Sequence, residues 1–561
     1  MARALVSARP MGGMPDPEPE DVLPEWRQVA FPPKGLDNYT SPLALDLSTM
    51  ADATDVIPWG DGWRQRNATA LVGDISSVAL LYAYRHQTAN GESRTYRWTL
   101  TGVEELTGTS WTALTGPTMT SNTYSGIALT QWGDLLIFSN GLDGMFVLTP
   151  STRTYATIAN APSAVHLTTF NRRVMASVPN SGRVQWCVAG DYTNWTSTDL
   201  GAGYEDLLAS PGGAQDTQSA VIPVSDDVAH VWRGTSIWQV SPTRQVAAPF
   251  AFSRLVSGIG SRWPKTCVAI PGGSAAMSDD RIWTMTAEGP KDISIPIKRV
   301  FVGVAQSRLR RSCMAYNASG RSLVLHVPDI GFVPGSLFAV AYVYHFSFET
   351  QTWARHLHGH SVRAISSTQY RDTLTIGQLS GTIGSQVGVI GDLGVSDYQS
   401  GFLMVTGETH PSFPTSHFVV RDAPDLNSGA SANGVDIQGQ AVSGAISPSW
   451  TTGVISASDP SRWVHLHEME ITYAQSLYQT GWVFLEYDTS NEGTWQTFLL
   501  AQILAGHGGS EEYSKDQTIR IPLNLHLEHP RLRLSFWSPS NFRLLDWRIR
   551  VTDGARRSMH A

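Results

Sequence analysis

At 561 residues the chain is too long for one simple hydrophobic core, so its length indicates two or three domains. Its net charge of −8, with only 16% charged residues, argues against a protein that binds nucleic acid by neutralising phosphates. This net charge still allows a channel surface along which DNA slides without binding. The 50 Gly, 31 Pro and 19 Trp are typical of turn-rich β structure, so we expect an all-β fold.

The first part of the chain, residues 1–69, is expected to form an N-terminal arm and an extended segment clamped to a larger unit. Residues 1–25 are rich in Pro and acidic side chains, and residues 32–70 show no helical or strand period of useful length. The start of the chain also lacks an apolar stretch adequate for a signal peptide.

Residues 70–400 carry a repeated hairpin, in which an apolar strand, an Asp or Asn turn and an aromatic strand follow one another. The clearest copies lie at 133–148, 225–240 and 272–289. Copies recur roughly every 40 to 55 residues, the length of one four-stranded propeller blade. The repeat predicts a β-propeller of six or seven blades, not all of them regular. One stretch, 296–316, breaks the pattern and is predicted to hold a short amphipathic helix.

Residues 401–561 are expected to form a loop-rich connection and then an antiparallel β-sandwich. At 531–537 the apolar residues share one strand face and the arginines point to the other, and the same alternation recurs at 544–551. A further hairpin is expected at 482–500, with its turn near 488–493. The sandwich would act as a platform-like second domain.

Three cysteines, Cys187, Cys267 and Cys313, are odd in number and far apart in the sequence. This pattern fits neither a disulfide framework nor a metal-binding spacing, so buried free thiols are expected. The longest apolar stretch, 337–348, is too short to span a bilayer and predicts a buried strand.

Two groups of histidines raise the question of a metal site. One holds His356, His358 and His360, and the other holds His465 and His467 next to Glu468 and Glu470. Residues i and i+2 of a strand share a face, so such a pair could ligate zinc, but no third ligand stands at a fixed spacing. We favour solvated or interface histidines and predict no metal and no cofactor.

Paired carboxylates were considered because propeller glycosidases use them. Asp226–Asp227 and Asp279–Asp280 both fall at turns of the repeat, in positions that look equivalent, as hairpin turns require. The sialidase Asp box, the nucleophile elbow, the phosphate-binding loop and the dinucleotide fingerprint are missing from the sequence. We therefore expect no enzymatic activity and no catalytic residues.

Five segments, in this order, resemble elements of the tail nozzle proteins of short-tailed, podovirus-type phages, also called tail tubular protein B or packaged-DNA stabilisation proteins. These segments are 35–68, 182–196, 221–240, 256–285 and 342–356. The resemblance covers about residues 35 to 360, and it extends to the C-terminal domain only in fold class.

The resemblance implies a structural virion protein, made in the host cytoplasm, that forms a homohexameric ring at the tip of a short tail. The ring would retain packaged DNA and form the channel for its ejection. Its expected partners are the adaptor and portal-proximal ring proteins, tail fibres or spikes, and double-stranded DNA that passes without sequence recognition. No membrane span is expected.

A carbohydrate-binding or glycan-processing protein, with a propeller and an appended sandwich, is the alternative. It is favoured by the hairpin at 482–495, where an Asp-rich turn precedes Trp495, as in some carbohydrate-binding modules.

Overall fold

The structure is a computed structural model that describes most of the chain. The described residues are 25–29, 35–41, 44–45, 49–59, 62–65, 68–120, 126–207, 216–302, 304, 309–318, 320–328, 341–358, 362–371, 398–406, 417–423, 449–455, 462–475, 481–489, 494–503, 517–527, 529–537 and 542–556.

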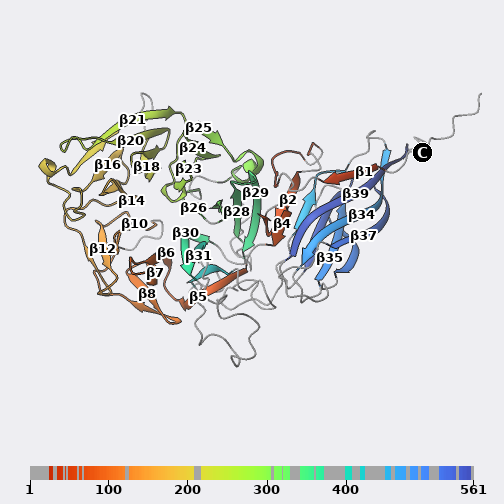
Figure 1. The fold of residues 1–561 in the computed structure, drawn as a ribbon, viewed down its shortest axis with the longest axis horizontal. Coiled ribbons are helices and arrows are strands. Elements are labelled where there is room, and N and C mark those ends of the chain that lie inside the picture. Colours follow the sequence, from red (N-terminus) through yellow and green to blue (C-terminus); the bar gives the residue numbers. More distant parts are fainter. Residues whose placement is uncertain are drawn as a thin grey trace, which may run out of the picture.

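Four-stranded antiparallel units in a ring make up the larger part of the molecule (Figure 1). Six are separate sheets and the seventh is one end of a nine-stranded sheet, so the described residues form seven propeller blades, within the predicted range. Blade 1 is β6 (Leu80–Gln87), β7 (Ser93–Thr99), β8 (Val103–Thr107) and β9 (Ser110–Ala113). Blade 2 is β10 (Ala128–Trp132), β11 (Leu135–Ser139), β12 (Phe146–Thr149) and β13 (Thr154–Thr157).

The next three blades follow the same meander along the chain. Blade 3 is β14 (His166–Phe170), β15 (Arg173–Ser177), β16 (Arg183–Trp186) and β17 (Gly203–Asp206). Blade 4 is β18 (Gln218–Pro223), β19 (Ala229–Arg233), β20 (Ser236–Pro242) and β21 (Phe250–Ser257). Blade 5 is β22 (Val268–Ile270), β23 (Gly273–Met277), β24 (Ile282–Thr286) and β25 (Gly289–Asp292).

The last two blades depart from a simple repeat. Blade 6 is β26 (Cys313–Asn317), β27 (Ser322–His326), β28 (Ala341–Ser347) and β29 (Thr352–His358), and it belongs to the nine-stranded sheet. Blade 7 is β30 (Val362–Arg371), β31 (Tyr398–Thr406), β32 (His417–Ala423) and the early strand β5 (Ala68–Ser76), which pairs with β32 and closes the ring. The propeller therefore runs to Ala423, past the boundary expected at residue 400.

The predicted hairpins are the second and third strands of blades 2, 4 and 5. Their buried strands, such as β19 and β23, pack between neighbouring blades. The Asp pairs are not in equivalent positions, contrary to expectation. Asp226–Asp227 precede β19, whereas Asp279–Asp280 lie in the turn between β23 and β24. Hairpin turns of both kinds favour Asp, so sequence alone did not separate them.

Apart from Leu309, which is α-helical, helical structure in the described residues consists of 3₁₀ turns. These are η1 (Thr198–Leu200), η2 (Pro264–Thr266) and η3 (Ile295–Val300). Within the stretch 296–316, where a short amphipathic helix is expected, η3 ends at Val300, Leu309 is α-helical and the inner strand β26 begins at Cys313. Residues 303 and 305–308 of this stretch lie outside the described residues. Its apolar residues Ile297 and Leu309 are nevertheless buried in the main core.

The second domain is a β-sandwich, as predicted (Figure 1). One sheet orders β3 (Val56–Trp59), β4 (Gly62–Gln65), β39 (Phe542–Arg556), β34 (Arg462–Gln475) and β37 (Gln517–Leu527), with β1 (Glu25–Val29) also paired to β39. The facing strands are β2 (Met50–Thr54), β33 (Ser449–Thr452), β38 (Arg531–Trp537), β35 (Gly481–Asp488) and β36 (Gln496–Ile503).

Along the sandwich strands, apolar side chains that point inward alternate with polar side chains that point outward, and the inward ones form the core. Leu532, Leu534 and Phe536 of β38 are fully buried and belong to the same apolar cluster as Trp547 and Ile549 of β39. The early segment contributes β1 to β4 to these sheets, so the segment expected as an extended clamp supplies strands to the sandwich. The arm expected at 1–25 lies, apart from Glu25, outside the described residues. β1, β2 and β4 pair with strands about 300 residues or more further along the chain, so local sequence carried no sign of these pairings, whereas β3 pairs with the adjacent β4.

Candidate functional site

The axis of the propeller is the site that the fold defines most clearly. Each blade has four strands, an even number, so the chain returns to the same side before the next inner strand begins. The inner strands therefore all begin at one mouth of the axis, which we call the entry mouth, and end at the other, which we call the exit mouth.

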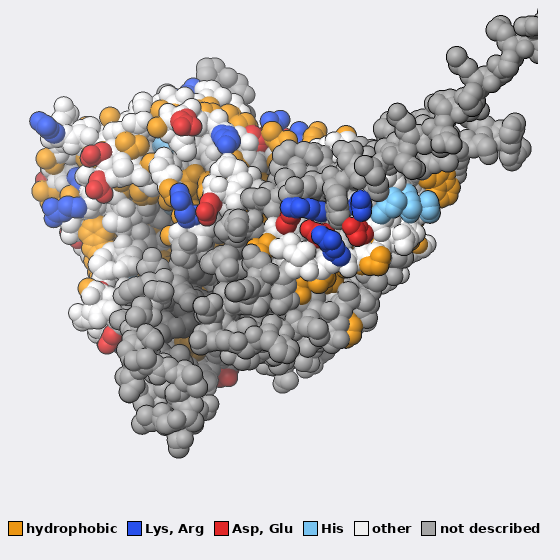
Figure 2. Space-filling view, turned by 45° about the vertical axis from the view of Figure 1, so that its right-hand side comes forward, with side chains coloured by type: hydrophobic (Ala, Val, Ile, Leu, Met, Phe, Trp, Pro, Cys, Tyr) orange, Lys and Arg blue, Asp and Glu red, His pale blue; other side chains and the backbone are white. Residues whose placement is uncertain are grey.

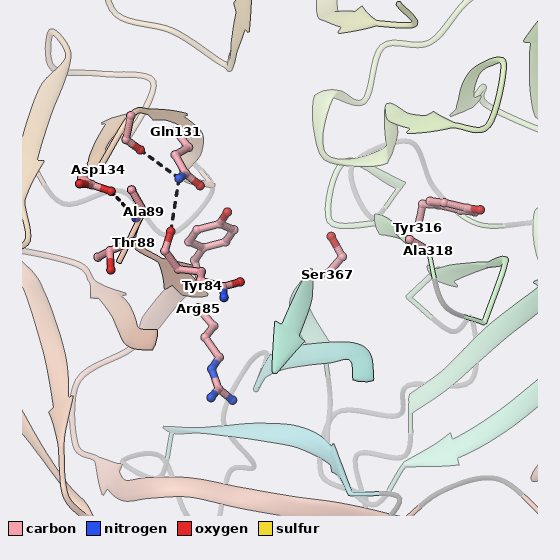
Figure 3. A pocket seen from close by; sticks show the side chains of 11 residues that line it. Tyr84, Arg85, Thr88, Ala89, Gln131, Asp134, Tyr316, Ala318 and Ser367 are labelled. Carbon is pink, nitrogen blue, oxygen red and sulfur yellow. Dashed lines mark hydrogen bonds between the residues drawn. The ribbon is translucent and has the colours of Figure 1, made fainter. Parts of the chain in front are cut away.

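A cavity of about 620 Å³ lies at the exit mouth (Figure 3). It is lined by the later parts of β6 and β10, by the end of β26 and by Ser367 of β30. Figure 3 shows Tyr84 and Arg85 on one side of the open space and Tyr316 and Ala318 on the other, with Ser367 between them. Four different blades thus enclose it.

Hydrogen bonds fix the wall of this cavity between blades 1 and 2. The Ala89 N–H donates to Asp134 Oδ1 at 2.6 Å, and the His86 ring contacts the Asp134 carbonyl oxygen at 3.2 Å. The Gln131 amide donates to Gly133 O at 2.9 Å. One carboxylate oxygen of Asp134 is therefore already used to hold the loop after β6.

Apart from the Arg85 guanidinium, the remaining polar side chains of the lining are uncharged. Burial raises the pKa of Tyr84, so its hydroxyl stays protonated at neutral pH and can donate or accept a hydrogen bond. Thr88, Gln131 and Ser367 supply further hydroxyl and amide groups, and Arg85 donates to Ser93 Oγ. Such a lining suits a polar, uncharged ligand rather than acid–base chemistry.

The first histidine group holds the two domains together. His356 is buried, stacks on His345 with ring centroids 3.7 Å apart, and contacts the Val56 carbonyl oxygen at 3.0 Å. It therefore joins β29 to β3. His358 is also buried, and His360 lies outside the described residues.

The second histidine group lies on the outer face of the sandwich. His465 has ring centroids at 3.9 Å from His467 and 3.8 Å from His526. Burial, together with these two neighbours, lowers the pKa of His465. His526 was missed by sequence reasoning, because only the register of β34 against β37 brings it opposite His465. Glu468 and Glu470 pair with arginines instead of joining the group.

In the parts of the chain that the structure describes, no group of three or more His, Cys, Asp or Glu side chains could hold a metal ion. All three cysteines are buried and free, as predicted, and burial raises the pKa of Cys187 to about 11 and those of Cys267 and Cys313 to about 12. None of the helices in the described residues is long and apolar enough to cross a membrane.

No family model and no curated protein matches the chain. Distant solved structures do. The chain is similar to virginiamycin B lyase from Staphylococcus aureus at 9% identity and a TM-score of 0.37, over 63% of this chain and 98% of that one. It is similar to BBS1N, solved in complex with ARL6DN, at 10% identity and a TM-score of 0.37, over 64% and 97%.

A third similarity is to the extracellular domain of the putative hybrid two-component system BT3049 from B. thetaiotaomicron. The identity is 9% and the TM-score 0.36, over 65% of this chain and 45% of that chain. These values are too low to transfer an activity, and the fold assignment above rests on the strand pairing of this chain itself.

Proposed function

We propose that this chain is a structural protein of a short phage tail, six copies of which form the nozzle ring that retains packaged DNA and channels its ejection. The observation that carries the proposal is the nine-stranded sheet, which runs from blade 6 through β29 and β2 into the sandwich. A sheet shared by both domains holds them at a fixed angle, which suits a subunit of a ring that carries force during DNA ejection.

Direct contacts reinforce the continuous sheet. Arg355 Nη2 lies 2.5 Å from Asp52 Oδ2, and Arg355 Nε donates to Thr54 Oγ1 at 2.8 Å. The Leu36 N–H donates to the Trp353 carbonyl oxygen at 2.8 Å. Trp353 is 1% exposed and lies in the one apolar cluster that spans blade 6 and the sandwich. The two domains share a core, which favours one rigid block over two tethered domains.

The segments that resemble nozzle proteins have structural roles on both sides of this joint. Residues 35–68 supply β2, β3 and β4 of the sandwich, whereas the four later segments lie in blades 3, 4, 5 and 6. The segments that carry the resemblance therefore lie on both sides of the joint and are not copies of one repeated hairpin.

The outer face of the sandwich offers a surface for contacts between subunits. Glu470 pairs with Arg520 at 2.9 Å, and Glu468 lies 3.7 Å from Arg550. Figure 2 shows basic and acidic side chains interspersed on this part of the surface, near a group of histidines. Alternating charges of this kind specify orientation between copies more than they add affinity, which is what a closed ring needs.

The mass of the assembled protein tests the proposal. Mixed with the tail adaptor ring, the purified 61.1 kDa chain should elute in light-scattering chromatography as an assembly that contains six copies. A chain that stays monomeric at every concentration and with the adaptor present would overturn it.

A glycan-binding protein is the second candidate, and the hydroxyl and amide groups that line the exit-mouth cavity favour it. In that case a neutral oligosaccharide should bind to the isolated monomer in calorimetry, and Gln131→Leu together with Ser367→Ala should abolish the binding. The nozzle proposal expects no heat of binding for any sugar.

A further inference from the structure

The entry mouth of the propeller differs in charge from the exit mouth. Four titratable residues, three of them basic, stand at or just before the starts of the inner strands of blades 3, 5, 6 and 7, namely His166, Lys265, Arg311 and Arg363. Gly126 stands just before the inner strand of blade 2. Since all inner strands begin on this side, the fold gathers these residues around the axis.

Lys265 extends from η2 to the opposite side of the ring. A Cβ atom added to Gly126 would lie 2.0 Å from Lys265 Cε and 2.8 Å from Nζ. The glycine thus leaves the space into which the lysine ammonium projects. Blade 5 and blade 2 are not neighbours in the ring, so this contact places Lys265 Nζ close to the propeller axis.

The ammonium is enclosed but still reached by solvent. Lys265 is only half-buried by exposed area, yet protein surrounds it so closely that burial lowers its pKa to about 8. Among the described residues Lys265 has no hydrogen bond and no ion pair. The neighbouring guanidinium groups of Arg363 and Arg311 lower its pKa further, whereas the Cys313 thiol raises it.

His166 has the same kind of surroundings. It is half-buried by exposed area, and burial lowers its pKa to about 4, so it is neutral at physiological pH. Its Nδ1 atom is buried and has no hydrogen-bond partner in the described part of the chain. A buried ring nitrogen without a protein partner is costly, and the cations gathered at the same mouth repel one another, so both features favour a bound anion.

We propose that the entry mouth binds a small tetrahedral oxyanion of the phosphate or sulfate class, with Lys265 as its main contact and Arg311 and Arg363 completing the positive surroundings. The anion would offset the repulsion among the three cations in a partly desolvated space. A small ion fits because protein encloses the ammonium, which excludes a nucleic acid strand. This site goes beyond the proposed role in a tail and does not depend on it.

Calorimetric titration of the full chain with inorganic phosphate at pH 7, in low salt, tests the site. Lys265→Met should weaken phosphate binding at least tenfold. Gly126→Ala should do so too, because its methyl group displaces the lysine, and its backbone needs no left-handed conformation. The matched control is Lys291→Met in the same blade, where the lysine is exposed and bonds Gln351 Oε1 at 3.1 Å, and it should bind as the native chain does.

Sulfate should compete with phosphate, whereas chloride at equal ionic strength should not. Phosphate binding should also weaken as pH rises above about 8, where Lys265 loses its proton. Native-like binding by Lys265→Met, or equal losses in Lys265→Met and Lys291→Met, would overturn the proposal, as would the absence of phosphate binding to the native chain. If Lys265→Met does not fold, phosphate binding by Gly126→Ala tests the proposal in its place.

Discussion

The ion pair of Asp216 and Arg233 at the start of blade 4 is buried, and breaking it should strongly lower the free energy of unfolding. Arg233 is 1% exposed and Asp216 is 5% exposed, with Arg233 Nη1 lying 3.4 Å from Asp216 Oδ2. The carboxylate also accepts the Thr235 N–H at 2.7 Å and the Ser236 hydroxyl at 2.8 Å. Burial lowers the pKa of Arg233, and the Asp216 charge opposes that shift.

Asp216→Ala should therefore lower the free energy of unfolding by about 3 to 5 kcal/mol, since it leaves a guanidinium without its carboxylate in a buried site. The two donors from Thr235 and Ser236 lose their acceptor as well. That loss is a large fraction of the roughly 5 to 15 kcal/mol that stabilises a typical domain. Asp216→Asn keeps an acceptor oxygen but not the charge, so its cost should be smaller.

Urea unfolding followed by tryptophan fluorescence measures these costs, because Trp232 is buried next to the pair in sequence. The double variant Asp216→Ala/Arg233→Met removes both charges and should be more stable than Asp216→Ala alone. A cost below about 1 kcal/mol for Asp216→Ala, the level of a surface ion pair, would refute this reasoning. So would a double variant less stable than Asp216→Ala.

Three further outcomes are expected. Burial lowers the pKa of His230 from 6.5 to about 4, so between these values the unfolded state binds a proton that the folded state does not, and stability is lost as pH falls. His230→Gln should remove up to about 3 kcal/mol of that loss, measured by urea unfolding at pH 7 and pH 4. The same stability difference between the two pH values in the variant and the native chain would count against this prediction. Arg355→Ala removes partly exposed contacts to Asp52 and Thr54, so it should lower the free energy of unfolding by about 1 kcal/mol. It should also speed hydrogen exchange in β2 and β29 but not in blade 3. The same exchange rate in β2 of the variant and of the native chain would contradict a role of Arg355 in joining the two domains. Gly273→Ala would place a Cβ atom 2.2 Å from the Met285 carbonyl oxygen, so it should lower the melting temperature. Gly102→Ala would place its Cβ atom 3.4 Å from Tyr155 Oη and should not lower it. Equal melting temperatures for the two variants would show that the backbone at Gly273 shifts to make room.

Local patterns predicted the parts of the fold that depend on neighbouring strands. The hairpins of blades 2, 4 and 5 join adjacent strands through short turns, and the alternation in β38 and β39 shows directly which face is buried. The blade count remained between six and seven for a physical reason. Some strands are too short for a periodic signal, as is β22 with its three residues.

Long-range pairing accounts for what sequence reasoning missed. Blade 7 is built from β5 and three strands that follow about 300 residues later, so no repeat of fixed length describes it. The sandwich strands β1, β2 and β4 likewise pair with distant strands. The same holds for the entry mouth, where only ring closure brings Lys265 next to Gly126. Composition and motif spacing carry no trace of such contacts.

Electron microscopy of the purified chain, alone and with the tail adaptor, tests the central proposal most directly. The account predicts a ring of six copies around an open channel, with the propeller and the sandwich at one fixed angle in every copy. Single particles of one chain, or images in which the two domains take many relative orientations, would contradict it.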